Sequence, residues 1–551
     1  MSLSFLIADS LHINERNFTS FIKFIKQNKF KIHFEDSQKE WIALYGIYDK
    51  KLDVLYDKIE LLSKLSENEL FKFSVYDINL FFICRAEIMS LVSTKQEWYD
   101  CRYPSSMHAM FSKLFKTNRA ELLQNMSAAW HWVEFWKLRL SDLPSFSYCC
   151  VFSGSLIYQK ALIEQLKFTP TKVIVMESLF TGNEYYCEEK YSHIANNSDI
   201  KFKAIYSNYI NNLESGNDYD KERVKAINKI LLSKNKNVEQ PTASEILKFS
   251  NSELPCVCII AQVINDFSVL EYKNIGLSTI AFYKELLYKL ASSGFNVVIK
   301  THPWEEKKNN VKTPLTKNIL SDFVRELPEQ LQERIIIVDH YSIKQLFGQV
   351  KWIMGLNSQA LIEAAFEGFK PIQFGDAFYG NKGFTSDYQI DEIDKCVKDI
   401  QKGDINGSLT LDEFNAFETF ITILLQKHAV CIHDSGLAQL RKIFAPIAYV
   451  PLVTQTTARE EAPKKQPDSK LSQSVSTQVA VSPTSKAIST DNKVKTTIII
   501  ETNEVDQENK NKKHSNFDKK MNKFKNNPRK FFSDSKNPAL RIFRHFFKNK
   551  T

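Results

Sequence analysis

The sequence is poor in glycine and lacks any regular cysteine motif. Only 15 of its 551 residues are glycine, which excludes collagen-like and glycine-rich disordered proteins. Its nine cysteines are odd in number and never spaced as Cys-x-x-Cys, so we expect reduced thiols and neither disulfides nor a metal site. No signal peptide and no apolar run of roughly 20 residues are present, which predicts a cytoplasmic protein unless it docks on a membrane.

The net charge of +9 is concentrated at one end of the chain. Residues 517–551 contain eleven Lys or Arg and two acidic residues, whereas residues 1–452 have a net charge of −2. A basic tail on a neutral body favours attraction to an anionic surface over a DNA-reading domain. We therefore expect no nucleic-acid partner, although binding through the tail stays open as an alternative.

The last hundred residues differ in composition from the rest. Residues 453–516 are rich in Ser, Thr, Gln, Lys and Asn and almost free of aromatics, which predicts a disordered linker. In residues 517–551, apolar side chains recur at helical spacing between cationic ones, at Leu540, Phe543, Phe546 and Phe547. We interpret this tail as an amphipathic helix that lies on anionic lipid at the inner face of the bacterial plasma membrane.

Short apolar runs alternate with amphipathic stretches before the linker. Strands are predicted at residues 4–8, 80–84, 148–152, 172–176, 256–260, 296–300, 334–338, 351–354 and 371–374. Helices are predicted at residues 16–27, 158–166, 278–292 and 360–367. This alternation implies an α/β protein with parallel sheets and helices on both faces.

A polar segment at residues 217–255 marks a domain boundary. We predict two Rossmann-like, doubly wound domains that face each other across a cleft, at residues 1–235 and 236–430. Residues 431–452 are expected to return as a helix that braces the two. Such sheets bind ligands at the carboxyl ends of their strands.

Candidate site residues, most of them polar, follow four predicted strands of the second domain. They are Gln262, Asp266, His302, Pro303, Asn357, Ser358, Glu363, Phe378 and Tyr379. Ser358 at a helix start suits a phosphate, and His302 can stabilise a departing monophosphate. Asp266 can act as nucleophile or base at an anomeric carbon. Glu363 could bind a ribose or a base, and helix capping is the structural alternative for Asp266, Asn357 and Ser358.

The first domain offers fewer candidates. Ser153 and Ser155 lie between a predicted strand and a predicted helix, so they could bind the donor's carboxylate or the acceptor. Glu177 follows the strand at 172–176 and could be the general base for the acceptor hydroxyl. The alternative for each is a solvated loop residue. The segment 181–186 suits sugar stacking and hydrogen bonding.

The motifs of the second domain, in their order and spacing, resemble the capsule polysaccharide biosynthesis family. They are Gln262-x-x-x-Asp266, Lys300-Thr-His302-Pro303, Asn357-Ser358-x-x-x-x-Glu363-Ala364, Gly368-x-x-Pro371 and Gly375-x-x-Phe378-Tyr379-x-x-x-Gly383-x-Thr385. This family includes retaining β-Kdo transferases of the KpsC/KpsS and WbbB types. The resemblance implies a GT-B fold, CMP-Kdo as donor, and a surface polysaccharide or glycolipid of capsule or lipopolysaccharide biosynthesis as acceptor.

The resemblance also implies roles for the site residues. Asp266 would form a covalent glycosyl-enzyme, so that two displacements retain the anomeric configuration, while the His-Pro and Asn-Ser motifs hold CMP. No metal or other cofactor is expected if helix ends and His302 bind the phosphate. Asp218 and Asp220 spell the Asp-x-Asp pattern of metal-dependent transferases, but they follow no predicted strand, so we interpret them as part of the polar boundary.

Two further functions stay open on the sequence. One is an inverting transferase for another CMP-nonulosonate such as sialic acid, with a base in place of the nucleophile. The other is a non-catalytic GT-B module that binds glycan or scaffolds an export complex at the membrane. The anomeric outcome and the release of CMP distinguish the three.

Overall fold

The computed structural model describes residues 3–42, 44–100, 106–212, 217–231, 245–271, 278–307 and 311–444. These all belong to a compact unit formed by residues 1–451. The predicted linker at 453–516 and the predicted amphipathic tail at 517–551 lie outside the described residues, as does the end of the predicted bracing segment 431–452.

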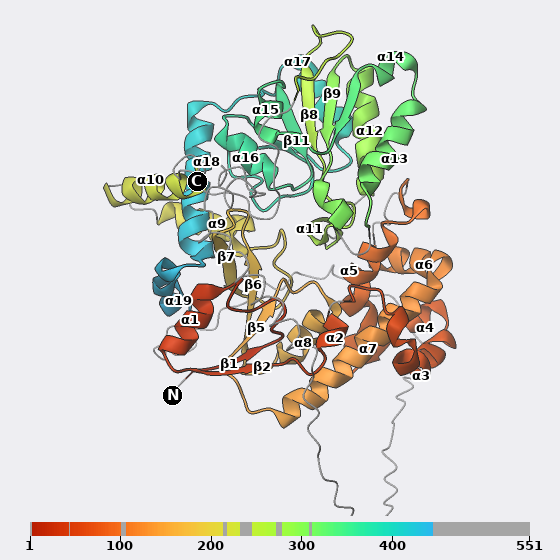
Figure 1. The fold of residues 1–551 in the computed structure, drawn as a ribbon, viewed down its shortest axis with the longest axis vertical. Coiled ribbons are helices and arrows are strands. Elements are labelled where there is room, and N and C mark those ends of the chain that lie inside the picture. Colours follow the sequence, from red (N-terminus) through yellow and green to blue (C-terminus); the bar gives the residue numbers. More distant parts are fainter. Residues whose placement is uncertain are drawn as a thin grey trace, which may run out of the picture. The chain divides into compact units, whose positions relative to one another are not determined.

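The first sheet has six strands in the order β14-β7-β6-β5-β1-β2 (Figure 1). Their bounds are β1 (Ser4–Ile7), β2 (Lys31–Phe34), β5 (Tyr148–Phe152), β6 (Lys172–Ser178), β7 (Glu184–Glu189) and β14 (Ala429–Cys431). β2, β1, β5 and β6 pair in parallel, whereas β7 and β14 pair antiparallel. The connection after β1 leads to β2 at one edge of the sheet, whereas the connection after β5 leads to β6, towards the other edge. This places a switch point between β1 and β5.

The second sheet is wholly parallel, in the order β10-β9-β8-β11-β12-β13. Its strands are β8 (Cys256–Ile260), β9 (Asn296–Lys300), β10 (Ile335–Val338), β11 (Trp352–Gly355), β12 (Ile372–Gln373) and β13 (Ser386–Asp387). This is the doubly wound order of dinucleotide-binding domains, with its switch point between β8 and β11. The predicted fold class, with two Rossmann-like sheets in a GT-B arrangement, is confirmed.

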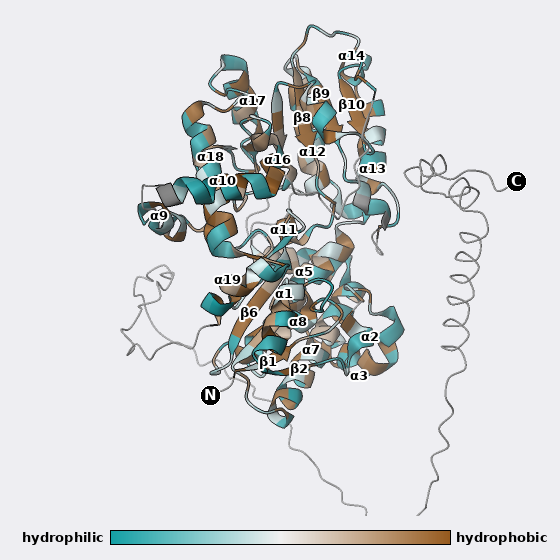
Figure 2. Ribbon diagram, turned by 60° about the vertical axis from the view of Figure 1, so that its left-hand side comes forward, coloured by the Kyte–Doolittle hydropathy of each residue, from teal (hydrophilic) through white to brown (hydrophobic). Residues whose placement is uncertain are grey.

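Helices cover both sheets, and Figure 2 shows hydrophobic colouring concentrated in strands such as β8, β9 and β10. On the first sheet they are α1 (Thr19–Gln27), α8 (Ile157–Leu166), α9 (Lys203–Asn211) and α19 (Leu437–Ile443). Those of the second half are α11 (Phe267–Leu270), α12 (Thr279–Ser292), α13 (Leu315–Arg325), α14 (Glu329–Gln332), α15 (Ile343–Phe347), α16 (Ala360–Phe366), α17 (Ile393–Lys402) and α18 (Leu411–Ile423). No helix in the described ranges has the length and apolar character needed to cross a membrane.

A helical insertion separates β2 from β5. It comprises α2 (Lys39–Ile42), α3 (Leu52–Ser63), α4 (Glu67–Lys72), α5 (Leu80–Val92), α6 (Met107–Thr117) and α7 (Arg119–Asp142), with a small hairpin of β3 (Ser74–Val75) and β4 (Ile78–Asn79). The predicted strand at 80–84 is therefore wrong. Nearly every residue of α5 is buried, so its first five residues form a continuous apolar run that shows no helical period. The Asn79 side chain caps this helix by accepting a hydrogen bond from the Phe82 N–H at 2.9 Å.

The other predicted strands are observed within two residues of their expected ends. The polar segment at 217–255 opens with a helix, α10 (Asn217–Leu231), which packs on α18. Arg223 of α10 pairs with Glu418 of α18 at 2.9 Å. After α18 the chain returns to the first sheet as β14, and α19 then packs against α1.

The glycine at the end of β11 leaves no room for a side chain against β8 at the switch point of the second sheet. A Cβ on Gly355 would lie 2.8 Å from the carbonyl oxygen of Ile260 in β8. We predict that Gly355→Ala lowers the free energy of unfolding by about 1–3 kcal/mol, because the sheet backbone must move to admit the methyl group. Gly348→Ala is the matched control, since its Cβ would meet nothing closer than 3.6 Å and its φ of −67° is helical. Chemical denaturation of both variants measures the difference, and equal losses would contradict the prediction.

Candidate active site

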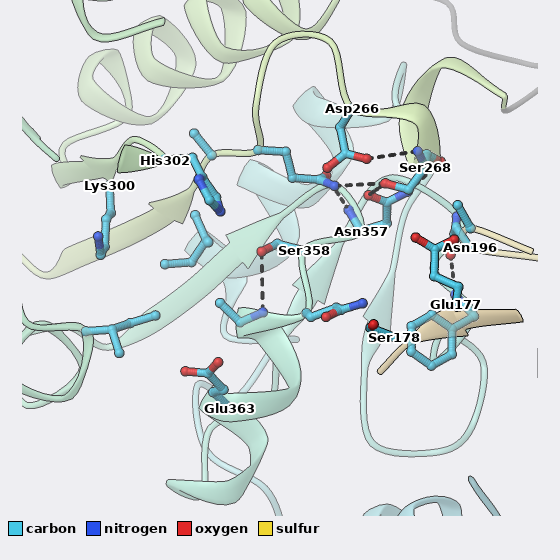
Figure 3. A pocket seen from close by; sticks show the side chains of 18 of the residues that line it. Glu177, Ser178, Asn196, Asp266, Ser268, Lys300, His302, Asn357, Ser358 and Glu363 are labelled. Carbon is cyan, nitrogen blue, oxygen red and sulfur yellow. Dashed lines mark hydrogen bonds between the residues drawn. The ribbon is translucent and has the colours of Figure 1, made fainter. Parts of the chain in front are cut away.

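A pocket of about 310 Å³ is lined from both sheets (Figure 3). The first sheet and the loops after it contribute Glu177, Ser178, Tyr186, Asn196 and Ser198. The second domain contributes Gln262, Asp266, Ser268, Lys300, His302, Pro303, Asn357, Ser358, Glu363 and Phe378, among others. Most of the second set follow β8, β9 and β11, so the pocket lies at the carboxyl ends of the strands around the switch point.

The pocket brings together most of the predicted site residues. Ser153, Ser155 and Tyr379 are the predicted residues that are absent from its lining. Tyr379 is fully buried and donates a hydrogen bond from its hydroxyl to the carbonyl oxygen of Ser358 at 2.7 Å. It therefore supports the loop that carries Ser358 from behind.

Side-chain amides join the loops after β8 and β11. The Gln262 side-chain oxygen accepts from the Asn357 backbone N–H at 3.0 Å, and its amide nitrogen donates to the Ser268 hydroxyl at 3.2 Å. Asn357 donates in turn to the Ser268 carbonyl at 3.0 Å. These hydrogen bonds tie the loop of Gln262 to the loop of Asn357. The two side chains therefore fix the part of the pocket that these loops form.

Asp266 is both a helix cap and a pocket residue. It precedes α11, and its Oδ1 accepts a hydrogen bond from the Ser268 N–H at 2.9 Å. Its Oδ2 takes part in no hydrogen bond with the residues that the structure describes. The cap fixes the carboxylate's orientation while leaving one oxygen for chemistry, so the structural and chemical interpretations of Asp266 are compatible.

Cationic and polar groups lie on the other wall of the pocket. Lys300, at the end of β9, is 5% exposed and donates to the carbonyl oxygen of Asp339 at 2.8 Å. His302 follows it in the loop after β9. Glu363 lies one turn into α16, and burial raises the pKa of its carboxyl, an effect that Lys344 and Lys300 oppose. The Ser358 hydroxyl accepts from the Ala360 N–H at 3.3 Å. This wall can hold an anion.

Glu177, near the end of β6, faces the pocket from the first sheet. Its Oε2 is shielded from solvent and has no hydrogen-bond partner among the described residues. Burial raises the pKa of Glu177 to about 7; Asp266 contributes to the rise, while Ser153 and His12 oppose it. A carboxyl group with a pKa near 7 can both hold and release a proton at physiological pH, as a general base must.

Two groups near this site went unrecognised in the sequence. Asp9 and His12 follow β1 at the switch point of the first sheet, and their side chains are 3.0 Å apart. The Tyr158 hydroxyl donates to the second Asp9 oxygen at 2.6 Å, and the His12 ring stacks on Phe152. Their position directly after the first predicted strand was an available signal.

Asn196 was also missed, and no sequence pattern marks it. It lies in the loop after β7 with a left-handed φ of 51°. Its side-chain oxygen accepts from the Phe378 N–H at 2.7 Å, and its amide donates to the Asp376 carbonyl at 3.2 Å. Lys201 pairs with the Asp376 carboxylate at 2.9 Å. The first domain thereby holds the loop that carries Phe378.

The turn after β5 is compact. Ser153 and Gly154 both have left-handed φ angles, of 58° and 80°, and a Cβ on Gly154 would meet the backbone of His193 at 3.0 Å. Ser155 is 1% exposed, and its hydroxyl has no partner among the described residues. By contrast Tyr185, within the segment expected to contact sugars, is a core residue of β7 with no exposed surface.

The raised pKa of Glu177 predicts a gain in stability when its charge is removed. When the pKa of a carboxyl is higher in the folded state than in the unfolded state, the protein loses stability as the pH rises from the unfolded-state pKa to the folded-state pKa. Glu177→Gln should therefore raise the free energy of unfolding at pH 8, by up to about 3 kcal/mol, and by much less at pH 5. Denaturation at the two pH values measures this. Glu189→Gln, which breaks a solvent-exposed pair with Lys172, is the control and should change stability by less than about 1 kcal/mol at both.

Residues 162–404 match the family model described as capsule polysaccharide biosynthesis protein. A search of curated proteins found no match. Among solved structures, the chain is similar to the Thermosulfurimonas dismutans KpsC β Kdo 2,4 transferase (16% identity, 50% of this chain, 79% of that chain, TM-score 0.35). It is also similar to the β Kdo 2,7 transferase of the same KpsC (14%, 56%, 89%, 0.31) and to an OtsA apo structure (7%, 82%, 100%, 0.32). The similarity to the capsule polysaccharide biosynthesis family therefore covers residues 162–404, which are less than half of the chain.

Proposed function

We propose that the protein is a retaining glycosyltransferase that moves Kdo from CMP-Kdo onto a bacterial surface polysaccharide or glycolipid. The observation that carries this proposal is the pair of carboxyl groups that reach one pocket from opposite sheets. Asp266 and Glu177 are close enough for the charge of one to raise the pKa of the other. A carboxylate that can attack and a second carboxyl group that can accept a proton are what a double displacement at an anomeric carbon requires.

In the first displacement, the free oxygen of Asp266 attacks the anomeric carbon of the donor. The bond from that carbon to the phosphate oxygen breaks, and its electron pair leaves with CMP, so that an ester of Asp266 remains. His302, Ser358 and the nearby Lys300 would stabilise the charge of the departing phosphate without a metal ion. Glu363 and the Asn357 loop would contact the cytidine.

In the second displacement, Glu177 takes the proton of the acceptor hydroxyl. The acceptor oxygen attacks the anomeric carbon, and the bond to Asp266 breaks and restores its carboxylate. Two inversions give net retention. Esterification removes the charge of Asp266, which is one of the causes that raise the pKa of Glu177. Glu177 therefore ionises more readily once the intermediate has formed and the base is needed.

The proposal also gives roles to the turn after β5, to Phe378 and to the basic tail. The turn at Ser153–Ser155 would bind the carboxylate of the sugar acid or the acceptor, and Phe378 would pack against the donor. The basic tail at 517–551 would hold the protein on the inner face of the plasma membrane, where a lipid-linked acceptor is found. A soluble polysaccharide acceptor would make that tail unnecessary.

The covalent intermediate can be detected directly. We predict that the full-length protein, incubated with freshly generated CMP-Kdo and no acceptor, gains the mass of one Kdo residue on Asp266. Asp266→Ala should show no adduct and a turnover more than about 1,000-fold lower, because the nucleophile is lost. Intact-protein and peptide mass spectrometry make both measurements. No adduct, with CMP release no greater than in Asp266→Ala, would favour another donor or a non-catalytic module, and an inverted product would favour the inverting mechanism.

The two displacements should respond differently to pH. Below its pKa Glu177 is protonated and cannot accept a proton, so transfer to the acceptor should slow as the pH falls through about 7. Formation of the adduct needs no base, so its rate should not fall with the pH in this range. Rapid-quench measurements of each step test this, with Glu177→Gln expected to accumulate the adduct. Transfer by Glu177→Gln at the wild-type rate would remove Glu177 from the mechanism.

A further inference from the structure

Three buried charged side chains join the two domains directly behind Asp266. Arg85 of α5 donates from Nη1 to the Leu270 carbonyl at 2.9 Å and from Nη2 to the Glu271 carboxylate at 2.9 Å. The Lys160 ammonium of α8 lies 2.7 Å from the other Glu271 oxygen. Glu271 ends the single turn of α11 that Asp266 begins, and Figure 1 shows α11 beside α5.

These side chains are almost completely removed from water. The exposed fractions are 9% for Arg85, 3% for Glu271 and 9% for Lys160. Burial raises the pKa of Glu271, but Lys160, His193 and Arg85 outweigh it, so the pKa is lowered overall and the carboxylate stays charged. Burial lowers the pKa of His193 to about 4, which leaves its ring neutral at pH 7. Buried ion pairs add little net stability, because desolvation offsets their attraction, but they demand one geometry.

Helix α5, which carries Arg85, also holds the segment that precedes Asp266. The Asn265 side-chain amide donates to the Ser90 carbonyl of α5 at 3.3 Å. The residue before Asp266 and the residues at the end of its helical turn are therefore both attached to the first domain. Glu177 belongs to that domain through β6. The Asp266 segment is thus attached to the first domain on both sides, while Ser268 ties it to the Asn357 loop of the second domain.

We propose that Arg85, Lys160 and Glu271 form an interdomain clamp that positions Asp266 of the second domain against Glu177 of the first. These are positioning residues, because none of them lines the pocket. The proposal rests on the proposed role of Asp266 as nucleophile. It assigns the first domain a part in placing the nucleophile, whereas the groups proposed to bind the donor phosphate, His302 and Ser358, come from the second domain.

Residues that position Asp266 and residues that only stabilise domain association differ in what their substitution affects. If the three residues only stabilise domain association, their substitution lowers thermal stability and leaves the rate of the first displacement per folded molecule unchanged. If they position Asp266, that rate falls while CMP still binds, because the CMP-facing residues are held by β9, β11 and α16. A small displacement of a reacting group is sufficient to cost about 100-fold in rate.

The test uses Glu271→Gln in the full-length protein. Adduct formation at saturating CMP-Kdo is expected to slow by about 100-fold, while the Kd for CMP changes by less than about twofold. Amide hydrogen exchange should become faster in residues 263–271 and stay unchanged in β8. Arg85→Lys, which keeps the charge, should retain more activity than Arg85→Met and serves if Glu271→Gln does not fold.

Glu35→Gln is the matched control, because Glu35 is also 3% exposed and paired with an arginine, Arg139, but lies outside the pocket lining. It should lower stability without changing the adduct rate. The clamp is overturned if Glu271→Gln forms the adduct at the wild-type rate, or if exchange in residues 263–271 is unchanged. If the wild-type protein forms no adduct, the proposed function fails, and the exchange measurement still decides whether the three residues hold the Asp266 segment.

Discussion

Neighbouring parallel strands whose connections leave in opposite directions create an opening that no crossover helix can cover. In the second sheet this opening lies between β8 and β11, and it places the loops of Gln262 and Asn357 side by side. In the first sheet it lies between β1 and β5. The other features of the site depend on this constraint, because each sheet presents its polar residues at only one edge. The pocket lies at the opening of the second sheet, and the first domain contributes residues of β6, β7 and the loop after β7.

The electrostatics of the pocket follow from bringing those edges together. One carboxylate, Asp266, is oriented by the backbone of its own helical turn, and the other, Glu177, has a shielded oxygen with no partner. Burial, with a contribution from the charge of Asp266, raises the pKa of Glu177 to about 7.

The sequence was a good guide to the parallel strands and a poor guide to contacts between distant residues. Buried parallel strands are continuous apolar runs, so β8 and β9 were located to the residue. The same rule failed at 80–84, because a fully buried helix is equally apolar. The strand-end rule also predicted Asp266 and Glu177. It could not predict the contacts of Asn196 or the pairing of Arg85 with Glu271, because those partners are separated by 180 residues or more and only the folded chain brings them together.

The return of the chain to the first sheet affects the order in which the protein can fold during synthesis. β14 completes a sheet whose other strands all come from the first 189 residues, and Phe444 packs into the core formed by Phe5, Phe21 and Phe24. A ribosome must therefore translate the whole second domain before the amino-terminal domain can bury its last aromatic side chains. The strands of the second sheet, by contrast, all come from one continuous stretch of the chain. The half of the protein that is made later can therefore complete its own sheet first.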